Sequence, residues 1–244
     1  MGKMINFRAR SKTEFDVQPK PYPAVKTLPK WFLDAKPYIP HFQDPETTSD
    51  GKFHVRNGTA NTDFKKCTPL LDGMSMGYIV PLWADVEIDS IQYERPEIFW
   101  RTIANVFELH GESTRNITPP EGYHPQVYKY NNCWIPQTPK GYSCLITSPI
   151  GHNDLTIKAV PAVVDTDKST LELVFPVWVK NNFQGVVEKG TPIVQIIPFK
   201  RDDWESTFDY YKDGEYKHIV EEKNFASTLI SHYIRNHWSK KTFK

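Results

Sequence analysis

The chain has 244 residues, 39% of them hydrophobic and 14% aromatic, which suits one large β domain or two small ones. Its 30 basic and 29 acidic residues nearly cancel, which excludes a global field that would attract nucleic acid or an anionic membrane. No apolar run is long enough to span a bilayer, and no apolar segment follows the charged N-terminus as a secretory signal requires. We therefore expect no membrane association.

The cysteines predict no disulfide framework. Cys67, Cys133 and Cys144 are an odd number and form no CxxC pair. We expect all three to be reduced and to lie in the core, because free cysteine is usually a small buried residue.

Residues 1–60 are rich in proline, which removes backbone donors and disfavours helix in the preceding residue. The aromatic side chains of this segment nevertheless give it something to bury. We expect an extended N-terminal arm over the domain, with no central strand and no regular helix beyond one helical turn in the sequence LPKWFLD. The alternative is a clamp on a neighbouring subunit. The prolines concerned are Pro19, Pro21, Pro23, Pro29, Pro37, Pro40 and Pro45.

Residues 61–205 have the pattern of a β domain. A short helix is expected from Thr62 to just before Gly73. After it, short apolar runs rich in β-branched and aromatic residues alternate with breaks containing Pro, Gly and Asp. In the sequence YIVPLWADVEIDS, Trp83, Asp85 and Glu87 alternate with apolar residues, which indicates a strand. The prediction is a mainly-β fold, an antiparallel barrel or sandwich.

Residues 206–244 have a different character. From Lys217 to Trp238 the apolar residues recur at helical spacing, which predicts an amphipathic helix packed on the core or on a partner. Leu229, Ile230 and Tyr233 are among the residues of this stripe. The same segment is mildly basic with interleaved aromatics, but acidic residues dilute the charge, so we expect no nucleic-acid partner.

One pair of motifs resembles dUTPases and dCTP deaminases. Residues 162–167 read AVVDTD, and residues 189–195 read KGTPIVQ. The resemblance implies a β-clip or jelly-roll-like fold, a trimer, Asp165 as the residue that activates water and Gln195 on a strand beside the pocket. Two features depart from the family: Lys168 replaces the tyrosine that stacks on the sugar, and Thr147–Pro149 lacks the expected arginine. These departures argue against dUTP hydrolysis.

A longer span, about residues 62–204, resembles an uncharacterised family of tailed-phage and bacterial proteins. The matching pieces are the PLWAD strand, the TPKGYS hairpin, the VVDTD hairpin and the sequence GTPIVQIIPFKR. This resemblance implies a phage-type source and supplies no activity.

The candidate catalytic residues are Asp165 and Asp167, which flank a hairpin tip and could act as a base or contact Mg²⁺. The alternative is a turn whose carboxylates accept backbone N–H groups. The candidate binding residues are Gln195, Arg201 and Lys168, and Arg201 could reach back to either carboxylate.

A second candidate site is a His-x-Asp pair, His152 and Asp154, which is half of the ligand set that holds non-haem Fe(II) in oxygenases. The sequence offers no later histidine on a strand to complete it, and the alternative is a polar turn.

The function we favour is that the dUTPase-like β core serves as a non-hydrolytic binding or assembly scaffold without a cofactor. We expect a phage accessory or virion-associated protein that forms a homo-oligomer, contacts other phage proteins and is located in the host cytoplasm or the virion. The alternatives are an enzyme that acts on a nucleotide or small polar substrate at Asp165, and an Fe(II)/2-oxoglutarate oxygenase that uses His152 and Asp154.

Overall fold

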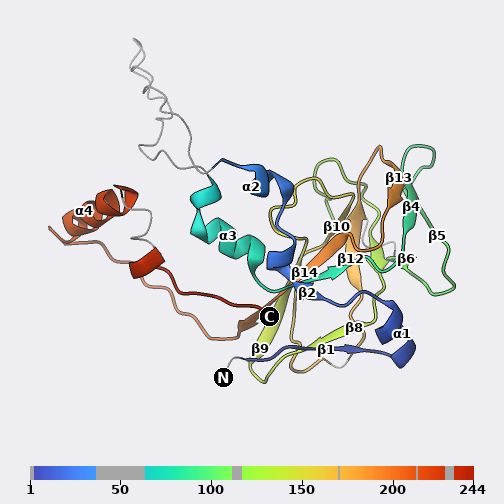
Figure 1. Ribbon diagram of the computed structural model, residues 1–244, viewed down its shortest axis with the longest axis horizontal. Helices are drawn as coiled ribbons and strands as arrows, with labels where there is room; N and C mark the ends of the chain where they lie inside the picture. Colours follow the sequence, from blue (N-terminus) through green and yellow to red (C-terminus); the bar gives the residue numbers. More distant parts are fainter. Residues whose placement is uncertain (1–2, 37–63, 112–116, 170, 213, 229–233) are drawn as a thin grey trace, which may run out of the picture. The chain divides into compact units, whose positions relative to one another are not determined.

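The computed structural model describes residues 3–36, 64–111, 117–169, 171–212, 214–228 and 234–244 (Figure 1). Most of its regular structure is antiparallel β-sheet, which confirms the mainly-β class. None of the sheets closes into a barrel within this described part of the chain. The chain divides into two compact units: one comprises residues 1–27, 74–203 and 243–244, and the other comprises residues 28–73 and 204–242.

A five-stranded sheet forms the centre of the first unit. Its order is β11 (Ala162–Val164), β9 (Tyr142–Thr147), β14 (Pro192–Lys200), β3 (Tyr78–Pro81) and β2 (Tyr22–Pro23). Strand β14 pairs with β9 from Gln195 opposite Thr147 to Lys200 opposite Tyr142, so the end of β14 lies beside the start of β9. The two motifs at Asp165 and Gln195 therefore belong to one sheet, with β9 between them.

The remaining strands form three smaller sheets. A four-stranded sheet has the order β10 (Ile157–Ala159), β12 (Phe175–Val179), β7 (Tyr128–Tyr130) and β6 (Phe107–Leu109). A three-stranded sheet has the order β13 (Gln184–Val187), β4 (Val86–Asp89) and β5 (Glu97–Trp100). A pair is formed by β1 (Asn6–Ala9) and β8 (Trp134–Gln137). All of these pairings are antiparallel.

The core of this unit is one large cluster to which several of the sheets contribute. Strand β14 contributes a continuous buried run from Ile193 to Ile197, the pattern of a strand covered on both faces. Tyr130 and Phe175 are fully enclosed beside it, with ring centroids 6.3 Å apart. Each large apolar side chain buried in this way stabilises the fold by roughly 1.5–3 kcal/mol.

Gly77 joins helix α3 (Thr68–Ser75) to strand β3. Its φ of +73° is in the left-handed region. A Cβ added at this position would lie 2.1 Å from the carbonyl oxygen of Ile196 in strand β14. Both the backbone conformation and the close approach of β14 therefore require glycine.

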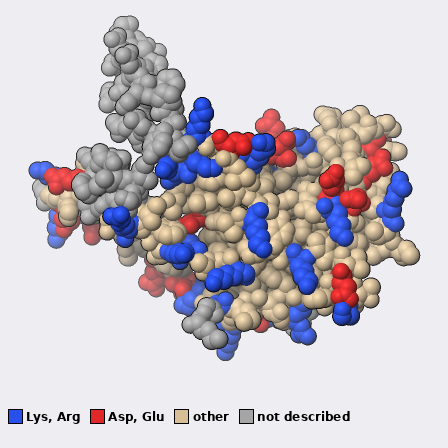
Figure 2. All heavy atoms as spheres, viewed as in Figure 1, with Lys and Arg blue, Asp and Glu red and all other residues tan. Residues whose placement is uncertain are grey.

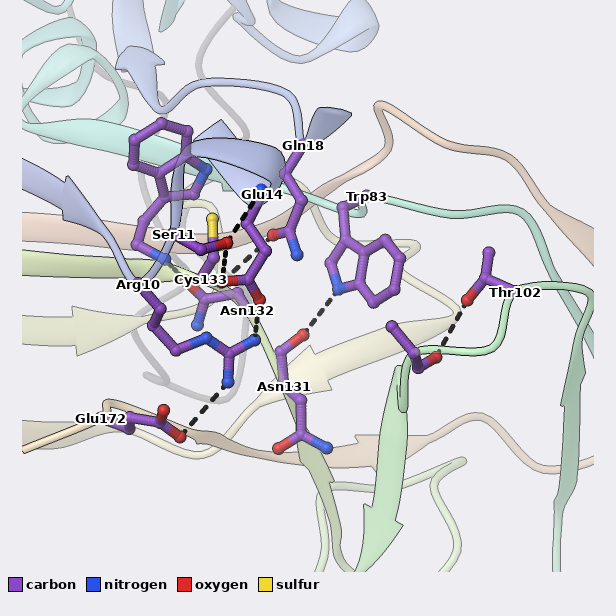
Figure 3. Close-up of polar contacts among 12 residues, drawn as sticks. Arg10, Ser11, Glu14, Gln18, Trp83, Thr102, Asn131, Asn132, Cys133 and Glu172 are labelled. Atoms are coloured by element: carbon purple, nitrogen blue, oxygen red, sulfur yellow. Dashed lines mark hydrogen bonds and ion pairs between the residues drawn. The ribbon is translucent and has the colours of Figure 1, made fainter. Parts of the chain in front are cut away.

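The N-terminal residues contain more regular structure than the prolines predicted. Helix α1 (Lys12–Val17) forms, so the expectation of no regular helix was wrong for these residues. Strand β1 pairs with β8 alone, so it is an extended segment and no central strand. Local capping explains the helix: the Ser11 hydroxyl accepts a hydrogen bond from the Glu14 N–H, and Arg10 pairs with Glu14 and Glu172 (Figure 3). The predicted turn at LPKWFLD is confirmed as helix α2 (Lys30–Asp34). Residues 37–60 of the predicted arm lie outside the described residues.

The second unit contains α2, most of α3, and α4 (Glu215–Thr228). A 3-10 turn, η2 (Phe64–Lys66), precedes helix α3, which begins at Thr68. The predicted start near Thr62 lies outside the described residues, and the predicted end before Gly73 was wrong, because α3 continues to Ser75. Helix α4 begins at Glu215, two residues before the predicted start at Lys217, and Leu229, Ile230 and Tyr233 lie outside the described residues. In the described part of the chain, no helix has the length and apolar character that a bilayer crossing requires.

After the second unit the chain rejoins the first. The ring of Phe243 packs edge-on against Tyr78, with centroids 6.0 Å apart, and the Tyr78 hydroxyl donates to the Lys244 carbonyl oxygen at 3.2 Å. Residues 204–242 therefore form an excursion that leaves the β unit after strand β14 and returns to strand β3.

The cysteines agree with the expected reduced state. All three are free, and Cys133 and Cys144 are buried as expected. Cys67 is only half-buried, which corrects the expectation of a core position. Burial raises the pKa of the Cys133 thiol to about 12 and that of Cys144 to about 11.

Candidate functional site

The two candidate carboxylates lie at a corner formed by three strands. Strand β11 ends at Val164, and a tight turn follows in which the Asp165 carbonyl oxygen accepts hydrogen bonds from the N–H groups of Lys168 and Ser169. Strand β9 begins beside this turn, and Arg201 directly follows the last residue of β14. The antiparallel register of the sheet therefore brings Asp165, Asp167 and Arg201 together.

Asp167 is the enclosed member of the corner, with a side chain that is 3% exposed. Its two carboxylate oxygens accept hydrogen bonds from the two terminal nitrogens of Arg201, of which Nη1 to Oδ1 measures 2.8 Å. The Gly141 N–H donates to Oδ2 at 2.8 Å. These donors favour the ionised form, so the Arg201 hydrogen bond above all lowers the pKa of Asp167 to about 2.

Asp165 is the open member, with a side chain that is 48% exposed. Its Oδ1 accepts a hydrogen bond from the Ser143 hydroxyl at 2.7 Å and lies 3.1 Å from Arg201 Nη1. The Ser143 hydrogen bond, helped by Arg201 and Lys168, lowers the pKa of Asp165. Lys168 Nζ lies 3.9 Å from Oδ2, so the predicted binding lysine faces this carboxylate.

Arg201 connects the whole corner. Besides the two carboxylates, its Nη1 donates to the Ser143 hydroxyl at 2.8 Å and to the Tyr142 carbonyl oxygen at 3.0 Å. The prediction that Arg201 reaches back to the hairpin is confirmed. A carboxylate with a lowered pKa is a weak general base, and a divalent cation would have to compete with the guanidinium for the same oxygens. The catalytic role of Asp165 stays a prediction.

Gln195 is placed in the sheet and not on a pocket wall. Its side chain is fully buried. Its Oε1 accepts a hydrogen bond from the Ile150 N–H at 2.7 Å, and its Nε2 donates to the Met76 carbonyl oxygen at 2.6 Å. The amide thus joins the loop after β9 to the end of α3 across the central strand, which makes Gln195 a cross-link between backbone segments.

The His-x-Asp pair occupies a turn, and its two side chains have different partners. His152 Nε2 lies 2.9 Å from the Thr27 carbonyl oxygen, whereas Asp154 pairs with Lys180 at 2.5 Å. Among the residues that the structure describes, no group of three or more His, Cys, Asp or Glu side chains could hold a metal ion. The oxygenase role therefore gains no third ligand from the described residues and stays a prediction.

The structure also contains a groove that was not predicted from the sequence. A groove of about 540 Å³ lies over the three-stranded sheet and is lined by Trp83, Asp85, Glu87, Phe99, Trp100 and Arg101, among others. The sequence predicted one strand through Trp83, Asp85 and Glu87, and the structure corrects this: β3 ends at Pro81, β4 begins at Val86, and residues 82–85 form no strand. Glu87 meets β5 through strand pairing, which local pattern does not show.

Surface charge shows no concentrated basic region on the face drawn in Figure 2, where basic and acidic side chains are interspersed. This distribution matches the near balance of charges in the sequence and gives no support to nucleic-acid binding through that face.

Comparison of the chain with protein-family models, with curated proteins and with solved structures finds no significant match. The relationship to dUTPases and to the phage family therefore stays an inference from the motifs alone.

Proposed function

We propose that this chain is a non-hydrolytic assembly scaffold that self-associates and contacts other proteins through its C-terminal excursion. The motif resemblances suggest the setting, a phage accessory or virion-associated protein located in the host cytoplasm or the particle. The observation that carries the proposal is an exposed aromatic segment, defined as residues 204–216.

The aromatic segment combines two properties that a folded monomer rarely tolerates together. Residues 201–212, which lead into helix α4, form no helix or strand. The five aromatic side chains of the segment are between 59% and 95% exposed, namely Trp204, Phe208, Tyr210, Tyr211 and Tyr216. Large exposed apolar groups of this kind mark interaction surfaces.

The amount of exposed aromatic surface is sufficient for an interface. An aromatic side chain offers roughly 150–250 Å², so the five together expose on the order of 800 Å². A standard protein interface buries about 800 Å² on each partner. The segment alone therefore supplies the area that one side of a stable contact needs.

The carboxylate corner supports the non-hydrolytic part of the proposal. Arg201 contacts both Asp165 and Asp167, and the described contacts of the guanidinium are all made within the corner. The arrangement stabilises the hairpin against strand β9 and keeps both carboxylates ionised.

The oligomeric state tests the assembly role. Light scattering after size exclusion should show an oligomer for the natural chain and a shift toward monomer for the double variant Trp204→Ala/Phe208→Ala. Leu171→Ala is the control, because it removes a largely exposed apolar side chain outside the segment. A monomeric natural chain, or an oligomer unchanged in the double variant, would refute the proposal.

The enzyme alternative has its own test. Purified chain is incubated with magnesium and a panel of nucleoside triphosphates, and product is measured by chromatography. Turnover that disappears in Asp165→Asn would establish the alternative and overturn the non-hydrolytic assignment.

A further inference from the structure

The groove over the three-stranded sheet has the size of a small-ligand site. It lies wholly within the β unit, between the end of helix α1, residues 83–87 and strands β5 and β13. Its volume of about 540 Å³ falls inside the range of roughly 300–1,000 Å³ typical of ligand pockets.

The floor of the groove is a fixed aromatic ring. Trp83 is 6% exposed, and its indole nitrogen donates to the Asn131 carbonyl oxygen at 2.7 Å (Figure 3). This bond satisfies the polar atom of the ring and fixes its plane. Because Trp83 itself is buried, it supports the groove from below, and a ligand would contact the more exposed rings of Phe99 and Trp100.

The walls are apolar and come from the two outer strands of the sheet. Glu87 on the middle strand is opposite Phe99 on β5 and opposite Val186 on β13, so the three side chains form a row across the sheet. Phe99 is 48% exposed and Trp100 follows it, and both line the groove. The row therefore places one carboxylate between two apolar walls.

The charges that line the groove balance. Asp85 and Glu87 are negative, and Arg101 and Lys189 are positive. Asp85 already accepts a hydrogen bond from the Lys189 backbone N–H, and Lys189 Nζ donates to the Val17 carbonyl oxygen. Among the described residues, neither the Glu87 carboxylate nor the Arg101 guanidinium has a hydrogen-bond or ion-pair partner.

This charge pattern selects among ligand classes. An anion such as phosphate would be attracted by Arg101 and Lys189 and repelled by the two carboxylates, and an ammonium group would meet the reverse, so the balanced charges favour neither class. A hydroxyl group can donate to a carboxylate and accept from a guanidinium, so a neutral polyol satisfies both. The ring faces of a sugar also present C–H groups that can pack on aromatic rings.

We propose that the groove formed by Trp83, Glu87, Phe99, Trp100 and Arg101 binds a neutral oligosaccharide. The sugar ring packs against the aromatic side chains, Glu87 accepts hydrogen bonds from its hydroxyls, and Arg101 donates to them. This site is independent of the aromatic segment and of the assembly role, because it uses no residue of either.

The binding test uses the full-length chain and three neutral probes: cellohexaose, maltohexaose and N-acetylchitohexaose. Saturation-transfer NMR detects contact, and calorimetry gives Kd. We expect at least one probe to bind, with Trp100→Ala and Arg101→Ala each weakening it by about tenfold. Tyr93→Ala, an exposed aromatic outside the groove, should leave Kd unchanged.

Further measurements distinguish neutral from charged ligands and check that the variants remain folded. Glu87→Gln keeps the shape of the side chain and should weaken binding a few-fold, with an unchanged thermal midpoint. Three results would overturn the proposal: no contact with any neutral probe, a Kd unaffected by both groove variants, or tighter groove binding of a heparin hexasaccharide or a trilysine peptide than of the neutral sugars.

Discussion

Replacing Gln195 with leucine should destabilise the fold, because the amide cross-links two backbone segments. The change removes the hydrogen bonds to Ile150 and Met76 and leaves an N–H and a carbonyl group without their partners. Each unsatisfied group costs about 1–3 kcal/mol, and the extra apolar burial of leucine offsets roughly 1–2 kcal/mol. The free energy of unfolding should therefore fall by about 3 kcal/mol.

Urea unfolding followed by far-UV circular dichroism measures this change. With a slope of roughly 2–3 kcal/mol per molar urea, the midpoint should fall by about 1 M. Gln92→Leu is the matched control, since Gln92 is exposed, and its midpoint should move by less than about 0.3 M. If the Gln195→Leu midpoint also moved by less than about 0.3 M, the structural role would be refuted, and Gln195 would again be a candidate binding residue.

Three further predictions concern the turn, the corner and the thiols. Gly77→Ala should lower the free energy of unfolding by at least about 3 kcal/mol, because the strain of a positive φ and the backbone clash add together. The control Gly122→Ala, at a position with positive φ and open space, should lower it by only about 1 kcal/mol in the same urea assay. Because the pKa of Asp167 is about 2 instead of 3.8, its contribution to stability is present above pH 3.8 and is lost as the pH falls toward 2. Arg201→Gln should therefore unfold at higher pH than the natural chain in an acid titration, and coincident curves would contradict this account. In the native state iodoacetamide should modify Cys67 alone, as peptide mass spectrometry will show, because burial raises the pKa of the other two thiols; equal labelling of all three would contradict it.

Local pattern was sufficient to predict several of the strands and the contact at the corner, although the single strand predicted from Tyr78 forms two strands, β3 and β4. Strands β12, β13 and β14 follow runs of β-branched and aromatic residues, which occupy pleated positions wherever the chain directs them. The Arg201 contact was predictable because its motif and the Asp165 motif end in opposite charges at the same edge of a sheet.

The parts that sequence did not predict depend on long-range pairing or on local capping. Strand β1 forms only because it pairs with β8, more than a hundred residues away along the chain. Helix α1 forms despite the nearby prolines because Ser11 caps it. The groove combines Glu87 with Phe99 through strand pairing, and Trp83 lies in the break between β3 and β4, which the alternating pattern did not predict.

The excursion that begins at Trp204 and returns at Phe243 has a mechanical consequence. Because both of its ends are attached to the β unit, a partner that grips the aromatic segment loads strands β14 and β3 together. A partner that binds the excursion only in the folded protein would raise the free energy of unfolding of the β unit, because binding to the native state alone shifts the folding equilibrium toward that state.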